Sequence, residues 1–226
     1  YNAAHGTSSL YSNTTGCYNT AVGHSAVLLN TTGNNNTGLG HHALYTNSTG
    51  CHNTAVGMYT NNNNTTASFN VGVGNYALQL TTTGASNVAM GYAAVLNNTT
   101  GCRNTGIGNY ALYTNSTGCF NTASGYKALY SNTTGKSNVS MGYVAMHSNT
   151  TGCRNTALGA YVLYANTTGC DNTGVGRDAL DANTEGKYNT AVGSSALGAN
   201  TTACQGVAVG FESLCSNTTA NNNVAV

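Results

Sequence analysis

The sequence lacks proline and tryptophan, and only 5% of its 226 residues are charged. Six Lys and Arg against five Asp and Glu give a net charge of +1, which excludes strong electrostatic attraction to nucleic acid or to an anionic membrane. No apolar run approaches the roughly 18 residues that a transmembrane helix needs. An enzyme built on long helices is also close to excluded, because the poor helix formers Thr, Asn and Gly account for 36, 35 and 29 residues.

The chain is made of a 17-residue repeat without insertions or deletions. One repeat reads N-T-T-G-C-x-N-T-A-V-G-x-x-A-L-Y-x, and its positions are numbered here as columns 1 to 17, with the first complete repeat starting at Asn13. Column 11 is always Gly, and column 7 is Asn in every repeat except at Gly206. We therefore predict that residues 1–226 form a single uninterrupted repeat domain of about 13 coils.

A repeat of this length is too short for a helical hairpin or a propeller blade, but it suits one coil of a parallel β-solenoid. The predicted fold is therefore all-β, a parallel β-solenoid (β-roll). Columns 7 to 10 are expected to form one strand and columns 14 to 17 a second, with columns 8, 10 and 15 lining the core. Glycines of columns 4 and 11 are expected at corners that need a positive φ or a close approach. Coils about 4.8 Å apart would let the column 7 asparagines bond to one another along the stack.

Four copies of Gly-x-Gly-x-x-Ala match the dinucleotide-binding fingerprint, and they begin at Gly38, Gly72, Gly106 and Gly174. We interpret them as columns 9, 11 and 14 of the repeat, because no helix can follow in a repeat that soon returns to Asn-Thr-Thr-Gly. No set of nucleophile, base and orienting group stands out. The chain is therefore interpreted as non-enzymatic, with no catalytic residue and no cofactor.

The repeat brings histidines together at one place in the chain, where a metal site has to be considered. His24 and His41 share column 12 on successive coils, and His42 stands beside them. A surface metal site is one interpretation of this arrangement. We expect a solvated pair instead, and predict no metal.

Carboxylates cluster in one stretch, at Asp171, Asp178 and Asp181, with Arg154 and Arg177 nearby. Arg154 would lie one coil below Asp171, in the same column. The cluster is therefore expected to form charge pairs between coils rather than to supply a general acid and base.

Seven of the eight cysteines occupy column 5. A disulfide needs Cα atoms about 4.4 to 6.8 Å apart, which cysteines on adjacent coils satisfy and those two coils apart do not. The predicted disulfides are Cys102 with Cys119, Cys153 with Cys170, and, across a corner, Cys204 with Cys215. A column of free thiols is the alternative, but so many cysteines in a polar repeat favour an oxidising environment.

Columns 1 and 3 spell the N-glycosylation sequon in eleven repeats. In a protein of a eukaryotic secretory pathway these asparagines are predicted to carry glycans. In a bacterial or phage protein the motif would serve only as a turn sequence at a corner of the coil. The predicted sites are Asn13, Asn30, Asn47, Asn64, Asn98, Asn115, Asn132, Asn149, Asn166, Asn200 and Asn217.

The segment from Asn104 to Gly118 reads N-T-G-I-G-N-Y-A-L-Y-T-N-S-T-G. It resembles the head repeats of trimeric autotransporter adhesins, and more closely the NTAVGxxALxxNTTG repeats of phage tail fibres and bacterial surface proteins. The resemblance covers the whole chain. It implies a left-handed parallel β-roll, often trimeric, that serves in adhesion or as a fibre shaft.

These observations favour a non-enzymatic structural filament or adhesin shaft, located extracellularly or at the cell surface. The chain begins and ends in a strand pattern without a cap, so we expect either flanking domains or stacking of copies end to end, besides lateral association. The expected partners are further copies of the chain and, for an adhesin, surface glycans or a host receptor, but neither nucleic acid nor a membrane interior. One alternative is a phage tail-fibre receptor-binding protein that reads its target with columns 6, 12 and 13. A second alternative is an ice-binding protein, for which the Thr ladders of columns 2 and 3 would be the starting point.

One repeat departs from the pattern, because Thr60 and Asn61 replace the usual Ala-Leu pair of columns 14 and 15. An inward Asn61 between Leu44 and Leu78 would leave its amide without partners. This coil is therefore predicted to bulge outward or to enclose a water, and to be the most distorted and mobile of all.

Overall fold

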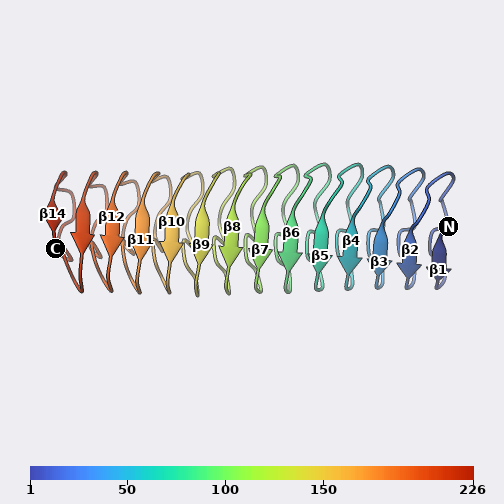
Figure 1. Ribbon diagram of the computed structural model, residues 1–226, viewed down its shortest axis with the longest axis horizontal. Coiled ribbons are helices and arrows are strands. Elements are labelled where there is room, and N and C mark those ends of the chain that lie inside the picture. The colour runs from blue at the N-terminus through green and yellow to red at the C-terminus, as the bar shows by residue number, and fades with distance from the viewer. The chain divides into compact units, whose positions relative to one another are not determined.

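The computed structural model describes all 226 residues, and it contains strands and turns but no helix (Figure 1). No helical segment able to cross a membrane is therefore present. The chain divides into two compact units, Tyr1–Thr117 (unit 1) and Gly118–Val226 (unit 2). Each unit is an all-β, parallel β-solenoid in which one short strand follows the last every 17 residues, which confirms the predicted fold class. A single domain over residues 1–226 stays a prediction.

Each coil contributes one strand, formed by columns 8 to 10. Unit 1 contains β1 (Ala3–His5), β2 (Thr20–Val22), β3 (Thr37–Leu39), β4 (Thr54–Val56), β5 (Val71–Val73), β6 (Val88–Met90) and β7 (Thr105–Ile107). Unit 2 contains β8 (Thr122–Ser124), β9 (Val139–Met141), β10 (Thr156–Leu158), β11 (Thr173–Val175), β12 (Thr190–Val192), β13 (Val207–Val209) and β14 (Val224–Ala225). Within each unit every strand pairs in parallel with the next, so that residues 17 apart lie opposite each other.

Columns 14 to 17 do not form the predicted second strand. Columns 13 and 15 have left-handed backbone in every coil, as at His42 (φ 54°) and Leu44 (φ 55°), and this conformation turns the chain. The backbone still bonds from coil to coil, since the N–H of Leu44 donates to the carbonyl of Thr60 at 3.0 Å. The second strand was wrong because Leu and Val, which favour strands, here adopt a φ that such residues rarely take.

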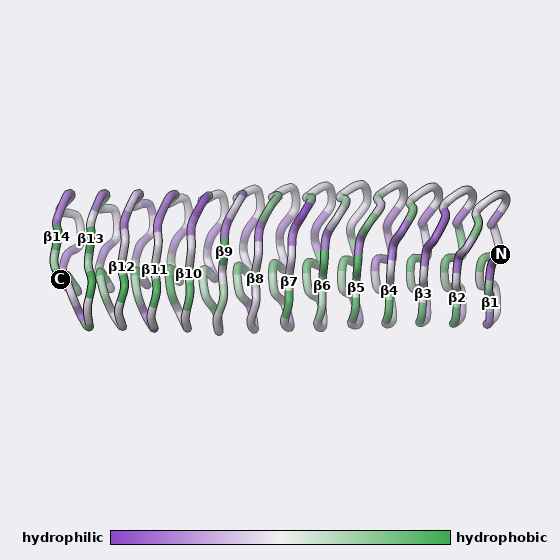
Figure 2. Tube along the Cα trace, in the orientation of Figure 1, coloured by the Kyte–Doolittle hydropathy of each residue, from purple (hydrophilic) through white to green (hydrophobic).

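The core is lined by columns 9, 14 and 15, so the prediction was right for column 15 and wrong for columns 8 and 10. Ala21, Ala26 and Val27 are fully buried, whereas Val22 of column 10 is 42% exposed. Alternate residues of a strand face opposite sides, so columns 7 and 9 share the inner face while columns 8 and 10 point outward. Figure 2 shows apolar residues along the strands. The bulkier of these residues, such as Val22 and Ile107, are the exposed ones.

Column 9 holds Ala in most coils, Ser at Ser140 and Gly in four coils, and the side chains of the preceding coil explain the four glycines. An ideal Cβ on any of its four glycines would collide with a methyl carbon of a β-branched residue in column 14 or 15 of the preceding coil. The pairs are Gly38 with Val27 (2.6 Å), Gly72 with Thr60 (2.6 Å), Gly106 with Val95 (2.5 Å) and Gly174 with Val162 (2.5 Å). The first glycine of each Gly-x-Gly-x-x-Ala match is therefore a packing residue.

Two features of the backbone require the invariant glycine of column 11, namely its positive φ and its close approach to the next coil. Gly23 has a φ of +131°, which side-chain-bearing residues rarely adopt, and a Cβ on it would lie 2.6 Å from the carbonyl oxygen of Gly40 on the next coil. In column 4, a Cβ on Gly33 would meet the carbonyl oxygen of Gly50 and the amide of Asn30. Column 11 is therefore confirmed for both positive φ and close approach, whereas column 4 shows only the close approach and admits Ala67, Ala203 and Ala220.

Candidate functional site

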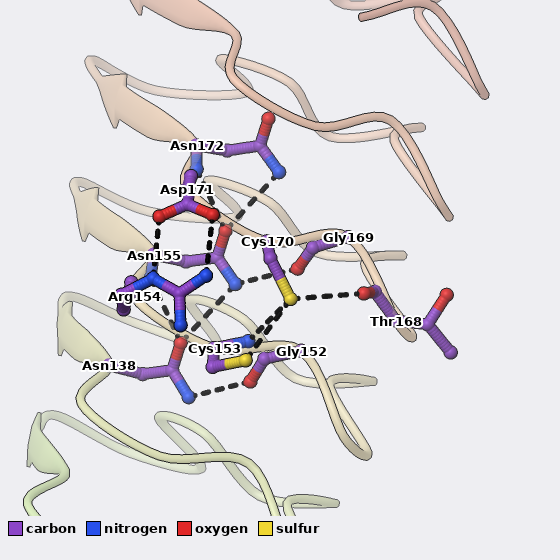
Figure 3. Close-up of polar contacts among 10 residues, drawn as sticks. All are labelled: Asn138, Gly152, Cys153, Arg154, Asn155, Thr168, Gly169, Cys170, Asp171 and Asn172. Atoms are coloured by element: carbon purple, nitrogen blue, oxygen red, sulfur yellow. Dashed lines mark hydrogen bonds and ion pairs between the residues drawn. The ribbon is translucent and has the colours of Figure 1, made fainter.

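The column 7 asparagines form the predicted ladder inside each unit. Asn155 is fully buried, and its Nδ2 donates to Asn138 Oδ1 at 3.2 Å and to the carbonyl of Gly169 at 2.8 Å (Figure 3). The backbone N–H of Asn155 donates to the same Asn138 Oδ1 at 3.0 Å. A buried amide with all its groups paired is a structural element, because paired groups avoid the cost of burial without partners.

A second asparagine ladder runs through column 1, and the sequence interpretation missed it. Asn166 Nδ2 donates to Asn149 Oδ1 at 2.7 Å and to the carbonyl of Gly169 at 3.1 Å. Gly169 thus accepts amides from both ladders, one from Asn166 of its own coil and one from Asn155 of the coil before. The signal in the sequence was the Asn of column 1, which we assigned to glycans and corners.

The column 1 ladder bears directly on glycosylation. Only Asn13 and Asn217 of the eleven predicted acceptors keep some exposure. The other nine are fully buried: Asn30, Asn47, Asn64, Asn98, Asn115, Asn132, Asn149, Asn166 and Asn200. An N-linked glycan attaches to Nδ2, which is the nitrogen that donates in this ladder. The fold argues against glycans at these nine positions, and glycosylation stays a prediction to be tested by mass.

Cys153 and Cys170 lie on adjacent coils with their sulfurs 3.2 Å apart, which is contact but longer than the roughly 2.05 Å of a disulfide (Figure 3). The backbone N–H of Cys153 donates to the Cys170 sulfur at 3.1 Å. Burial, followed by the hydrogen bond with Cys170, raises the pKa of the Cys153 thiol. The column therefore brings the two thiols together, and the disulfide between them stays a prediction.

The other two predicted disulfides also stay predictions. Cys102 belongs to unit 1 and Cys119 to unit 2. In unit 2, the sulfur of Cys204 donates to the carbonyl of Thr202 at 3.5 Å, and that of Cys215 lies 3.8 Å from its neighbouring serine hydroxyl.

The carboxylate cluster forms one charge pair between coils, as predicted, and a second pair within a coil. Arg154 holds Asp171 on the next coil through two hydrogen bonds of 2.7 and 2.8 Å, and these lower the pKa of Asp171 (Figure 3). Arg177 pairs with Asp178 at 2.9 Å. Because the Arg154 pair is exposed, it contributes little to stability. Asp181 is partly buried, and this burial raises its pKa.

The structure brings His24, His41 and His42 into one stack of rings, where the sequence had suggested a pair with a neighbour. Ring centroids lie 5.3 Å apart for His24 and His41 and 4.1 Å apart for His41 and His42. These three residues are called the histidine cluster below.

The irregular coil stays in register. Asn61 is fully buried with φ 49°, close to the value of every other column 15 residue, and β4 and β5 pair normally. The outward bulge, one of the two predicted outcomes, is therefore wrong, and the enclosed water and the mobility of this coil stay predictions. The expected lack of partners is confirmed, because neither Nδ2 nor Oδ1 of Asn61 makes a hydrogen bond.

Fold and ladders together define a β-solenoid repeat protein. No protein-family model matches the chain, and no curated protein or solved structure matches it significantly.

Proposed function

We propose that the chain is a non-enzymatic structural filament or adhesin shaft, outside the cell or at its surface, that associates with further copies of itself. The observation that carries this proposal is the outer strand face, defined as the side chains of columns 8 and 10. Its exposed large residues include Val22 (42%), Met90 (44%) and Ile107 (42%) in unit 1, and Met141 (46%), Val192 (38%) and Val209 (37%) in unit 2.

This face has no Asp, Glu, Lys or Arg in either column. Its column 10 side chains are apolar in every coil except at His5 and Ser124. Exposed apolar side chains gathered in one row mark interaction sites on soluble proteins. A second copy of the chain is the occupant that fits best, because its outer strand face repeats at the same spacing of about 4.8 Å and can match coil for coil. No charge has to be desolvated when two such faces meet.

Column 5 supports an oxidising location for this filament. The sulfurs of Cys153 and Cys170 need to approach by only about 1.2 Å to reach the bonded distance. A disulfide would join two coils covalently, and it would stabilise the fold by lowering the conformational entropy of the unfolded chain. Intact mass before and after reduction tests for it, and the same measurement tests for glycans, which we expect at most on Asn13 and Asn217.

Self-association is tested by replacing one residue of the outer strand face. Met141→Lys should abolish or sharply reduce assembly in sedimentation velocity and negative-stain micrographs. Tyr143→Lys is the matched control, since this residue is 51% exposed in the same coil but lies beyond the Gly142 corner. Assembly that is lost equally in both variants, or a wild-type chain that stays monomeric at high concentration, would count against the proposal.

Receptor binding by a phage tail fibre is a second candidate, favoured by a row of rings in the variable columns. Tyr126 and Tyr143 stack at 5.6 Å, and Tyr143 meets Tyr161 at 5.5 Å. Exposed aromatic rings with polar tips suit binding of sugars and proteins. A glycan array separates the two functions: a defined glycan lost in Tyr143→Ala, together with a monomeric chain, would favour receptor binding.

Ice binding is a third candidate, for which the threonines of column 8 are better suited than those of columns 2 and 3. Thr31 Oγ1 of column 2 donates to the carbonyl of Ser48 at 3.0 Å, so this hydroxyl is engaged. Column 8 instead presents half-exposed threonines on the strands, as at Thr156, Thr173 and Thr190. Thermal hysteresis that Thr173→Lys removes would support this function, and a filament without ice affinity should show none.

A further inference from the structure

The histidine cluster lies on unit 1, and nothing in the proposed filament uses it. His24 and His41 are exposed and occupy column 12 of successive coils, while His42 is half-buried in column 13. The rings of His24 and His42 are 5.7 Å apart and within 16° of parallel. Three imidazoles from two coils therefore form one compact group.

The backbone fixes the positions of these residues. The N–H of His42 donates to the carbonyl of His24 at 3.1 Å, and the N–H of Tyr59 donates to the carbonyl of His41 at 3.0 Å. Consecutive residues of a strand would point to opposite faces, but His42 has a left-handed φ of 54°, and its ring stacks on that of His41. The solenoid thus assembles the group without any help from a ligand.

The surroundings of His42 favour its neutral form. Burial, followed by the nearby His41 and His24, lowers the pKa of His42. The ring of Tyr45 packs on His42 at 4.6 Å and that of Tyr59 at 5.2 Å. Neutral imidazole is the form that binds metals, because its free nitrogen keeps a lone pair.

The sequence favoured a solvated pair without metal, but the geometry of all three rings points the other way, and we propose that the histidine cluster binds one divalent transition-metal ion of the Zn²⁺, Ni²⁺ and Cu²⁺ class. The candidate ligand nitrogens of all three side chains lie within 4.8 Å of one another. Nitrogens bound to one tetrahedral ion at about 2.0 to 2.1 Å are about 3.3 Å apart, so modest rotation of the exposed His24 and His41 side chains completes the site. An all-imidazole set selects these ions over Mg²⁺ and Ca²⁺, which prefer oxygen ligands.

The test is a calorimetric titration of Zn²⁺ into the full chain with its thiols alkylated, so that the cysteines do not compete. We expect one ion per chain, and at least about tenfold weaker binding in His24→Ala and His41→Ala, which is about 1.4 kcal/mol or more. His52→Ala is the matched control, because His52 is exposed and stacks on Phe69 at 5.0 Å, outside the cluster. This control should bind like the wild type.

Thermal unfolding supplies a second readout, since an ion that binds only the folded chain stabilises it. Zn²⁺ should raise the unfolding midpoint of the wild type and of His52→Ala, but not that of His41→Ala. Equal affinity in wild type and His41→Ala would overturn the proposal. So would a stoichiometry of one ion per two chains with metal-dependent dimers, because the ion would then bridge copies rather than the three histidines of one chain.

Discussion

The column 1 ladder is continuous in unit 2 and interrupted in unit 1. In unit 2 each amide from Asn149 to Asn200 donates to the asparagine one coil before it, at 2.7 to 2.8 Å. In unit 1 the corresponding bonds run as far as Asn64, and then Thr81 takes the place of asparagine. The oxygens Asn64 Oδ1 and Thr81 Oγ1 are buried without partners.

Strand pairing is the same in both places, because β5 and β6 pair across Thr81 as regularly as β10 and β11 do in unit 2. The backbone ladder therefore does not depend on the side-chain ladder. An asparagine in column 1 can accept a hydrogen bond from the amide of one adjacent coil while it donates to the other. The hydroxyl of Thr81 makes no hydrogen bond to either adjacent coil. With Asn61, the interrupted stretch contains most of the buried polar atoms that lack partners, which makes it the predicted weak point of unit 1.

The largest expected effect comes from removing a core leucine where unit 2 is regular. Leu180 is fully buried, and Leu180→Ala should lower the free energy of unfolding by about 2 to 5 kcal/mol, through lost burial and the cavity left behind. Urea denaturation followed by far-UV circular dichroism measures it. Tyr188→Ala, at a side chain that is 58% exposed, should cost far less. Equal losses would mean that column 15 is not the core.

The next effect tests the size match between coils. Gly38→Ala should cost about 1 to 3 kcal/mol by overpacking against Val27. Val27→Leu in the same chain should recover most of this loss, because it recreates the combination of Leu44 with Ala55 found one coil further on. A double-mutant cycle measures the coupling. If the two substitutions simply add, the glycines of column 9 have another explanation.

This size match also shows where sequence reasoning reached its limit. The repeat itself and the close approach at column 11 could be predicted, because each follows from spacing and glycine alone. The strand predicted in columns 7 to 10 is present and is one residue shorter, covering columns 8 to 10. The inner face could not be predicted, since Val22 looks more like a core residue than Ala21 does. Apolar character favoured column 10, but the space inside a coil is shared with two asparagine ladders and admits only small residues in column 9.

Column 1 was misread for a related reason. The triplet that defines a sequon also defines this corner, so pattern alone cannot separate Asn30 as a glycan acceptor from Asn30 as a buried donor. Only burial distinguishes them, because a side chain with 0% exposure and bonds to Asn13 and Gly33 is already fully engaged. The sequence placed His42 beside His24 and His41, but it could not show that the His42 ring joins their stack, because a left-handed φ has no signature in the sequence.

A smaller change in the free energy of unfolding is expected when the threonine that interrupts the column 1 ladder of unit 1 is introduced into the ladder of unit 2. Asn166→Thr should leave Asn149 Oδ1 without its donor and cost about 1 to 3 kcal/mol in urea denaturation. The reverse change, Thr81→Asn, should stabilise unit 1 by supplying a donor for Asn64 Oδ1. Opposite signs for the two substitutions would establish that the ladder, and not the local backbone, makes the two stretches differ. Equal signs would contradict this account.

The smallest expected effect is at Asn61, where the column 15 ladder of leucines is broken. Asn61→Leu should raise the free energy of unfolding by about 1 to 2 kcal/mol, because it removes two unpartnered polar atoms and fills the column between Leu44 and Leu78. Asn61→Ala separates the two contributions, since it removes the amide but leaves a cavity, and it should be nearly neutral, unlike Leu180→Ala. Limited proteolysis should show cleavage near Asn61 in the wild type and slower cleavage in Asn61→Leu. A loss of more than about 1 kcal/mol in Asn61→Leu would instead mean that this amide makes specific bonds in solution, to a buried water or to another chain, and that the coil is an interaction site.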